Sequence, residues 1–198
     1  MKKRMLFVLT DDFADWEAAF LAAALRGGTR PDGAGRFETL YASPGGRAVR
    51  SIGGLAVQPD RDLTALPDNC AGVALVGGFG WRSEAAEEVA PLLAEARRRG
   101  LPVGAICDAC SFLAAHGFLN EVRHTGNTVA VLRERGGDRY TGAARFEERQ
   151  AVRDGGIITA NGSASLEFAR EWLRELAADT EEAIEAWYAF NKQGFYRD

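Results

Sequence analysis

The sequence predicts an α/β fold: a three-layer sandwich with helices on both faces of a mainly parallel central sheet. Strand-like segments alternate with segments of helical periodicity along the chain, which is typical of a parallel sheet. Residues 71–76 form a continuous apolar run, as expected for a strand buried on both faces. The chain has 198 residues, 46% of them hydrophobic and 26% charged. These values fit a single domain over residues 1–198 with a full core.

In the first third of the chain, glycine and aspartate mark the ends of the expected elements. Asp11 and Asp12 are expected to cap a helix that ends near Arg26, before the glycine pair 27–28. Gly53 and Gly54 suggest the turn of a hairpin. The expected elements are a strand at 4–9, a helix to about 26, a loop at 27–36, a strand at 37–42 and a hairpin formed by 48–52 and 55–57.

The remaining elements follow the same alternation. Ser83, Ser163 and Thr180 each precede a segment of helical periodicity, so each is expected to begin a helix. Polar turn residues 154–156 separate two short apolar runs and predict a hairpin. The expected elements are a strand at 71–76, a helix from 83 to about 99, a strand at 101–106, helices at 109–116 and 127–135, a hairpin formed by 150–153 and 157–160, and helices after 163 and 180.

Charge and cysteine content exclude several classes of protein. The net charge is −4 and the arginines are scattered, so we expect no nucleic-acid partner. The apolar run 5–9 near the N-terminus is too short for a signal peptide or a membrane span. The three cysteines are Cys70, Cys107 and Cys110, an odd number that fits a reducing compartment. We therefore expect a cytoplasmic protein without a membrane partner.

Cys107 stands directly between the predicted strand 101–106 and the predicted helix 109–116. A sharp turn there would present the thiol at the carboxyl edge of the sheet, where ligands of open α/β folds bind. The N-terminus of the helix would favour the nucleophilic thiolate. Free cysteines are also commonly small buried hydrophobes, so position alone leaves both interpretations open.

Several motifs together resemble the ThiJ/PfpI superfamily, which has the class I glutamine amidotransferase-like, flavodoxin-like fold. They occur in the order of that family and span about residues 3–176. The motifs are residues 105–107 with 113–119 around Cys107, the glycine pair in 76–78, the segment 11–17, the segment 123–127 and residues 159–162 with 166–169.

The resemblance implies a catalytic role for three side chains. Cys107 would be the nucleophile, and Glu17 would share a proton with it. The apolar neighbours of Glu17 at helical spacing, Phe13 and Leu21, predict a raised carboxyl pKa; a solvent-exposed helix-edge glutamate is the alternative. His124 would be the general base, with a surface histidine beside Arg123 as the alternative.

Other residues would complete the pocket. Gly77, Gly78 and the N–H of Asp108 would form an oxyanion or anion pocket, or a plain turn. Trp16 and Trp81 would line its mouth, or act as core or surface filler. His116 competes with His124, but it lies about 13 Å from Cys107 along a helix at ~1.5 Å per residue. The sequence offers no group of metal-ligating residues at suitable spacing, and the resemblance implies no cofactor.

Two departures from the family pattern bear on the reaction. Asp108 stands where the protease-like branch carries histidine, and an inward-pointing carboxylate would disfavour the thiolate. Residues 109–111 replace the Gly-Pro type sequence common in the family. Separately, Cys107 and Cys110 form a C-x-x-C at a helix start, which suggests thiol–disulfide exchange as an alternative.

The resemblance thus implies a cysteine-dependent enzyme that acts on a small electrophile and forms a homodimer. The candidate reactions are amidase- or peptidase-like hydrolysis, glyoxalase- or deglycase-like activity and isocyanide hydration. Two alternatives are a non-catalytic sensor of oxidative stress or chaperone that uses oxidation of Cys107, and a C-x-x-C thiol–disulfide oxidoreductase.

Overall fold

A six-stranded sheet forms the centre of the structure, a computed structural model that describes residues 2–30 and 33–194. The strand order is β2-β1-β5-β6-β8-β7, and all neighbours are parallel except β8 and β7. The predicted α/β fold with a mainly parallel sheet is therefore confirmed. The strands are β1 (Lys3–Val8), β2 (Phe37–Ala42), β5 (Cys70–Leu75), β6 (Val103–Ile106), β7 (Ala151–Asp154) and β8 (Ile157–Ala160), with a separate hairpin of β3 (Val49–Arg50) and β4 (Ala56–Val57).

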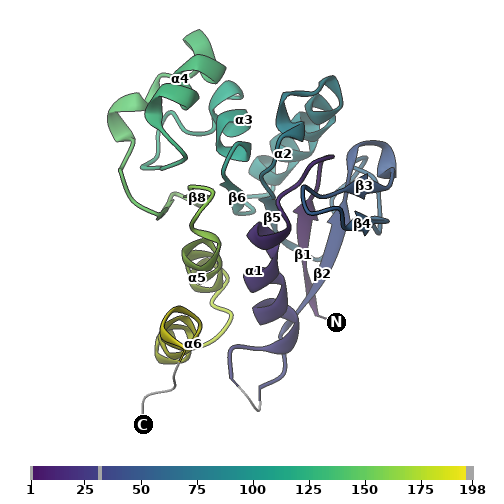
Figure 1. Cartoon of the computed structure of the whole chain (residues 1–198), viewed down its shortest axis with the longest axis vertical. Coiled ribbons are helices and arrows are strands. Elements are labelled where there is room, and N and C mark those ends of the chain that lie inside the picture. Colours follow the sequence, from purple (N-terminus) through teal and green to yellow (C-terminus); the bar gives the residue numbers. More distant parts are fainter. Residues whose placement is uncertain (1, 31–32, 195–198) are drawn as a thin grey trace.

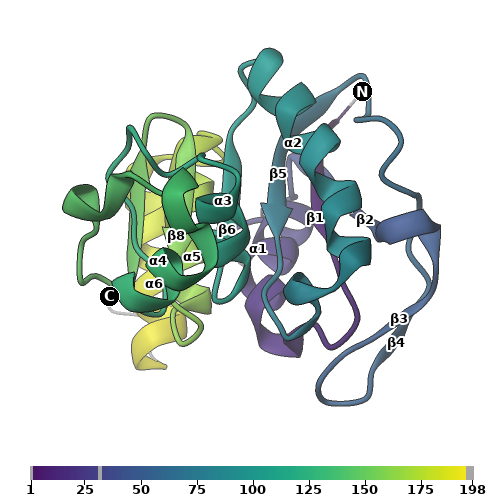
Figure 2. The same cartoon turned by 90° about the horizontal axis from the view of Figure 1, so that it is seen from above.

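Helices cover both faces of this sheet (Figures 1 and 2). One face carries α1 (Asp15–Gly27), α5 (Ser165–Glu175) and α6 (Glu181–Gln193), and the other carries α2 (Val89–Arg98), α3 (Ala109–Ala115) and α4 (Val129–Gly136). Strand β1 serves both layers, because successive side chains point to opposite faces. Leu6 and Val8 belong to one apolar cluster, whereas Met5 and Phe7 belong to the other. Burial on both sides explains the continuous apolar runs of the central strands.

The topology places a crevice at the carboxyl edge of the sheet. From β1 the chain crosses to β2 on one side, and it later returns to β5 on the other side of β1. Ligands bind at such a switch point in open α/β sheets. The segments after β1, β5, β6 and β8 therefore meet at one edge.

The first helix begins later than predicted. Asp11 and Asp12 do not cap it, since α1 starts at Asp15 without a side-chain cap. Asp12 instead adopts a left-handed backbone conformation with φ of 54°, and the Asp11 carboxylate accepts a hydrogen bond from the Arg50 N–H. The segment after β1 is thus tied to the β3–β4 hairpin instead of forming helix. Of the predicted loop 27–36, residues 31–32 lie outside the described ranges.

The predicted caps of the later helices had mixed outcomes. The Thr180 hydroxyl does cap α6 by accepting from the Ala183 N–H. Ser163 does not cap α5, because its N–H and hydroxyl both donate to the Asn161 side-chain oxygen. The Ser83 hydroxyl donates to the Gly80 carbonyl. A short 3₁₀ helix (Glu84–Glu88) then precedes α2.

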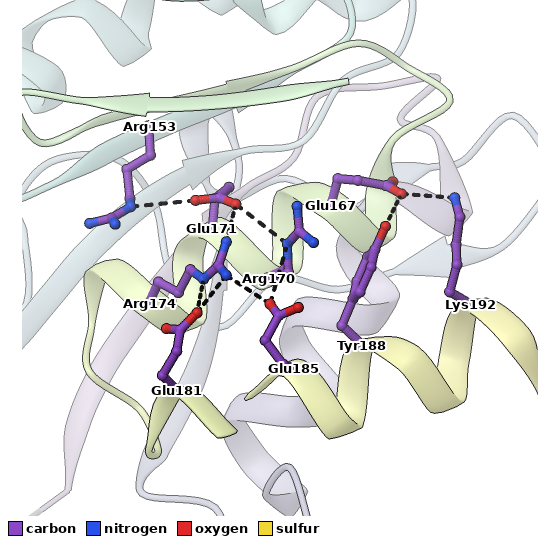
Figure 3. A network of polar contacts seen from close by, with 9 residues as sticks. All are labelled: Arg153, Glu167, Arg170, Glu171, Arg174, Glu181, Glu185, Tyr188 and Lys192. Carbon is purple, nitrogen blue, oxygen red and sulfur yellow. Dashed lines mark hydrogen bonds and ion pairs between the residues drawn. The ribbon is translucent and has the colours of Figure 1, made fainter. Parts of the chain in front are cut away.

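A network of charged side chains attaches α6 to α5 (Figure 3). Glu167 of α5 is nearly buried and accepts hydrogen bonds from the Tyr188 hydroxyl and the Lys192 ammonium, both at 2.8 Å. Arg174 of α5 pairs with Glu181 and Glu185 of α6. These polar contacts add to the apolar contacts of α6, whose Ile184 is buried in the core. In the described part of the chain, no helix is both long and apolar enough to span a membrane.

Candidate active site

Cys107 occupies a sharp turn between β6 and α3. Its φ of 60° is in the left-handed region, where a residue with a side chain is strained. The Cys107 N–H donates to the Ala160 carbonyl of β8 at 3.0 Å, and its carbonyl accepts from the Cys110 N–H at 3.1 Å. These bonds hold the turn at the carboxyl edge of the sheet and leave the thiol partly exposed. The chain thus has the geometry of the predicted nucleophile elbow.

Glu17 lies against this thiol from the first turn of α1. Its side chain is buried, with 1% of the residue exposed. Oε2 accepts a hydrogen bond from the Gly77 N–H at 2.8 Å. Oε1 is also buried and has no partner in the described structure other than the Cys107 thiol. Glu17 is therefore not a solvent-exposed helix-edge residue, and its carboxyl group is placed to exchange a proton with the sulfur.

Burial sets the protonation of this pair. It raises the pKa of Glu17 from 4.5 to about 7, against the opposing effect of the hydrogen bonds from Gly77 and Cys107. Burial and then the Glu17 charge also raise the pKa of Cys107, opposed by hydrogen bonds from Asn127 and from the Asp108 N–H. Two negative charges side by side are unfavourable. With its pKa raised to about 7, the Glu17 carboxyl group is only partly ionised near neutral pH. Loss of both protons from the pair is disfavoured, so a thiolate forms when the remaining proton resides on Glu17.

Asn127 supplies a hydrogen bond to the sulfur that the sequence did not predict. Its Nδ2 donates to the Cys107 Sγ at 3.3 Å, and its Oδ1 accepts from the Gly162 N–H at 2.9 Å. The second bond fixes which end of the amide faces the thiol, because a backbone N–H can only donate. The predicted helix 127–135 starts at Val129, since Thr128 caps it. Asn127 therefore lies outside the helix and can reach Cys107. Thr128, a residue type that commonly caps helices, was the sequence signal that the helix begins after Asn127.

Two glycines keep the surroundings of the thiol open. A Cβ at Gly162 would lie 2.8 Å from the Cys107 Sγ, and one at Gly77 would lie 2.4 Å from the Glu17 Oε2. Any side chain at either position would force the pair apart. The Gly77 N–H is occupied by Glu17, so of the predicted glycine donors only the Gly78 N–H lacks a hydrogen-bond partner in the described residues.

The thiol lies in a cavity of about 460 Å³ that opens to solvent. Arg82 lies in its wall and forms an ion pair with Asp108 at 3.5 Å. The Asp108 carboxylate also accepts from the Ser111 hydroxyl at 2.8 Å, so its charge is balanced by other groups than the thiol. The lining residues are Ala14, Trp16, Glu17, Ile52, Gly78, Phe79, Arg82, Cys107, Asp108, Asn127 and Val131.

The two tryptophans differ in their placement. Trp16 lines the cavity and its indole N–H donates to the Gly162 carbonyl at 3.2 Å. Trp81 does not line it: this side chain is fully buried, its ring lies tilted against Phe112 at 5.1 Å between centroids, and its indole N–H donates to the Val76 carbonyl. Of the two alternatives for Trp81, the structure supports the core residue, because the turn after β5 directs its side chain into the core.

His124 also departs from its predicted place. It is fully buried, and its two ring nitrogens are bound to the Val122 carbonyl at 2.8 Å and the Tyr140 hydroxyl at 2.6 Å. A carbonyl only accepts, so Nδ1 carries the proton and Nε2 accepts from Tyr140. Burial lowers the pKa of His124, so the ring is neutral. The structure does not bring this imidazole to Cys107, and His116 instead pairs with Glu87 at 3.2 Å.

The other two cysteines are not at the site surface. Cys110 is fully buried, and its thiol lies against the carbonyls of Ala105 and Ala160. Burial raises its pKa far above the ordinary value. Cys70 is the first residue of β5, at the opposite end of the strand from Gly77. A C-x-x-C exchange centre would need Cys110 to reach Cys107, and its sulfur faces the core instead.

Comparison with known proteins identifies the family. Residues 3–175 match the DJ-1/PfpI family. The chain belongs to this family. A DJ-1/PfpI relative from Bacillus subtilis, named uncharacterized protease YdeA, is 36% identical over 98% of the chain and 93% of its own length. A second one, uncharacterized protease YoaZ from the same organism, is 30% identical over 90% of the chain and 86% of its own length.

Solved structures agree with this membership. A DJ-1 superfamily protein from Agrobacterium tumefaciens is 37% identical, has a TM-score of 0.85 and is matched over 98% of this chain and all of its own. A ThiJ/PfpI family protein from Bacillus anthracis is 29% identical, with a TM-score of 0.87 over 98% of this chain and 92% of its own. The predicted resemblance to the ThiJ/PfpI superfamily is thereby confirmed.

Proposed function

We propose that the protein is a cysteine-dependent enzyme that adds the Cys107 thiolate to an electrophilic carbon of a small molecule. The observation that carries the proposal is the position of the sulfur. It lies between a buried carboxyl group that shares its proton, Glu17, and an amide that donates to it, Asn127, at the surface of an open cavity. A nucleophile, a proton carrier and a donor to the sulfur are the groups that covalent catalysis requires.

Hydrolysis of an amide or ester is the reaction we favour, and the names of the two Bacillus subtilis relatives support a hydrolase. The Glu17 carboxylate takes the thiol proton while sulfur attacks the carbonyl carbon, and the π electrons move to oxygen. The intermediate collapses, the C–N or C–O bond breaks, and Glu17 returns the proton to the leaving group. Water then adds to the thioester, gives its proton to Glu17 and displaces the thiolate. The products are an acid and an amine or alcohol.

The oxyanion in this scheme needs hydrogen-bond donors. The N–H groups of Gly78 and Asp108 are the candidates, because Gly78 lines the cavity and the Asp108 N–H lies at the sulfur. The Gly77 N–H is excluded, since it binds Glu17. Two such donors stabilise the developing charge only if they are fixed before the reaction, and the turns after β5 and β6 hold both.

Turnover tests the proposal. Purified wild type, Cys107→Ser and Glu17→Gln would be incubated with small amides, esters, 2-oxoaldehydes and isocyanides, and product would be followed by NMR. We expect one class to be turned over by wild type and to be lost in Cys107→Ser. Equal turnover by Cys107→Ser, or none by wild type on any class, would rule the proposal out. Sedimentation velocity would test the expected homodimer, and imaging of a tagged chain would test the expected cytoplasmic location.

A redox sensor is the second candidate, favoured by the buried Glu17 Oε1 beside the thiol, which could hold an oxidised sulfur. Hydrogen peroxide would supply the oxygen atoms and be reduced to water as Cys107 becomes a sulfinic acid. A sensor would gain two oxygen atoms at Cys107 by mass spectrometry without any turnover that depends on this cysteine.

A further inference from the structure

The exposed hydrophobic side chains are concentrated at one place on the described surface. The large ones are Trp16, Ile52, Leu55 and Phe79, with exposed fractions of 49, 41, 57 and 74%. Three of the four, all except Leu55, line the cavity that contains Cys107. Single exposed apolar residues need no explanation, but a cluster at a cavity marks a binding surface.

The wall they form comes from three separate segments. Trp16 belongs to α1, Ile52 to the turn of the β3–β4 hairpin and Phe79 to the loop after β5. Positions 16, 52 and 79 are far apart in the chain, so their proximity is not a feature of one local loop. The fold gathers them around the nucleophile.

Hydrogen bonds hold each segment in place. The Trp16 indole N–H binds the Gly162 carbonyl, and the Phe79 N–H binds the Asp12 carbonyl at 3.0 Å. The Ile52 N–H binds the Phe13 carbonyl at 2.9 Å, and the Gly53 N–H next to it binds the Asp15 carboxylate. The apolar faces are thus presented on a fixed wall, which lowers the cost of ordering them around a ligand.

The charged side chain of Arg82 in the cavity wall is already paired within the protein, so the cavity does not favour a charged substrate. Arg82 is the cation in the wall, and it is matched by Asp108 at 3.5 Å and Glu134 at 3.7 Å. The cavity volume of about 460 Å³ is within the range of sites for ligands much larger than a three-carbon dicarbonyl.

We infer that Trp16, Ile52 and Phe79 bind an uncharged aromatic or branched aliphatic group of the substrate, attached close to the carbon that Cys107 attacks. This inference rests on the proposed function and specifies its substrate class. It favours neutral acyl compounds with a bulky apolar group over small dicarbonyls. Contact between a ring of the substrate and this wall removes apolar surface of both from water.

Alkylation of Cys107 tests the inference without knowledge of the natural substrate. Its thiolate displaces chloride from chloroacetamide, N-benzylchloroacetamide and N-(carboxymethyl)chloroacetamide, and each rate is divided by the rate with glutathione. For wild type we expect the benzyl reagent to exceed the parent by at least about tenfold, the fold-change that burial of a ring side chain brings. The carboxymethyl reagent should give no such gain.

Variants of the wall provide the matched control. Phe79→Ala and Ile52→Ala should each reduce the ratio of the benzyl rate to the parent rate at least threefold. Leu55 belongs to the same β3–β4 hairpin as Ile52, is 57% exposed and does not line the cavity, so Leu55→Ala should leave the preference intact. All three side chains are exposed, so these substitutions should change the free energy of unfolding little.

The outcomes separate this inference from the proposed function. A Cys107 that reacts with the parent reagent but shows no benzyl preference would overturn the inference alone. A Cys107 that reacts with none of the reagents at any pH would overturn both. If Phe79→Ala and Ile52→Ala convert a dimer to monomers in sedimentation velocity without changing the preference, the wall is covered by a second copy of the chain, and the inference is wrong.

Discussion

The side-chain amide of Asn127 lies between the Cys107 Sγ, at 3.3 Å from Nδ2, and the Gly162 N–H, at 2.9 Å from Oδ1. This orientation aims a neutral donor at the sulfur. The resemblance implies His124 as the base for this thiol, whereas the structure places at the sulfur the amide of Asn127, which cannot accept a proton at neutral pH. Glu17 is then left as the proton carrier of the pair.

The Asn127→Asp variant tests the role of this donor. A carboxylate can still accept from the Gly162 N–H, but it turns a donor into a like charge beside the thiolate, which raises the thiol pKa. We expect the midpoint of Cys107 alkylation against pH to rise by about one pH unit or more, so that labelling at pH 7 slows roughly tenfold. The matched control is Asn120→Asp, because Asn120 makes the same two kinds of bond to another loop. An unchanged midpoint in Asn127→Asp would show that the amide does not influence the thiol.

Glu17→Gln should change the pH dependence of stability. The folded pKa of Glu17, about 7, is raised above the unfolded value of 4.5 because burial disfavours the charge. The folded state therefore binds the proton more tightly, and this contribution is full below pH 4.5 and is lost as pH rises through about 7. The displacement corresponds to roughly 3 kcal/mol. Urea unfolding at pH 5 and pH 8 should show wild type losing stability relative to Glu17→Gln, and parallel curves would contradict the raised pKa.

Gly162→Ala should block the thiol. The added methyl group would lie 2.8 Å from the Cys107 Sγ and 3.4 Å from the Glu17 Oε1, closer than van der Waals contact to the sulfur. We expect iodoacetamide labelling of Cys107 to slow more than about tenfold, with a loss of stability of about 1–3 kcal/mol from overpacking. Gly27→Ala is the control, since a Cβ there meets nothing within 4 Å. Wild-type labelling of Gly162→Ala would mean that this backbone does not confine the thiol.

Tyr140→Phe tests whether His124 acts on Cys107. The variant leaves Nε2 of the buried His124 without the Tyr140 hydroxyl as donor, which should reduce the free energy of unfolding by about 1–3 kcal/mol. The pH midpoint of Cys107 alkylation should not move, because the imidazole is bound elsewhere. A shifted midpoint with unchanged stability would restore the predicted role of His124 as the base.

Much of the arrangement could be predicted from local sequence. Continuous apolar runs define the central strands, since burial on both faces requires them at every position. For Cys107 the position between a buried strand and a helix start left two interpretations open, and the resemblance to the ThiJ/PfpI superfamily favoured the nucleophile. The same resemblance favoured a buried Glu17 over a solvent-exposed one.

What the chain could not reveal is where long-range contacts direct each side chain. His124 and Asn127 are three residues apart, yet the first turns to Tyr140 in the interior and the second to Cys107. The sequence leaves Trp16 and Trp81 with the same expected role, but α1 presents Trp16 at the surface and the turn after β5 buries Trp81. The sequence by itself determined the order of strands and helices along the chain, because that order follows from periodicity and turn chemistry, and its family motifs singled out the cysteine at the elbow. Only the tertiary structure decided the partners of that cysteine and the apolar wall beside it, because both are assembled from residues that the sheet brings together from distant parts of the chain.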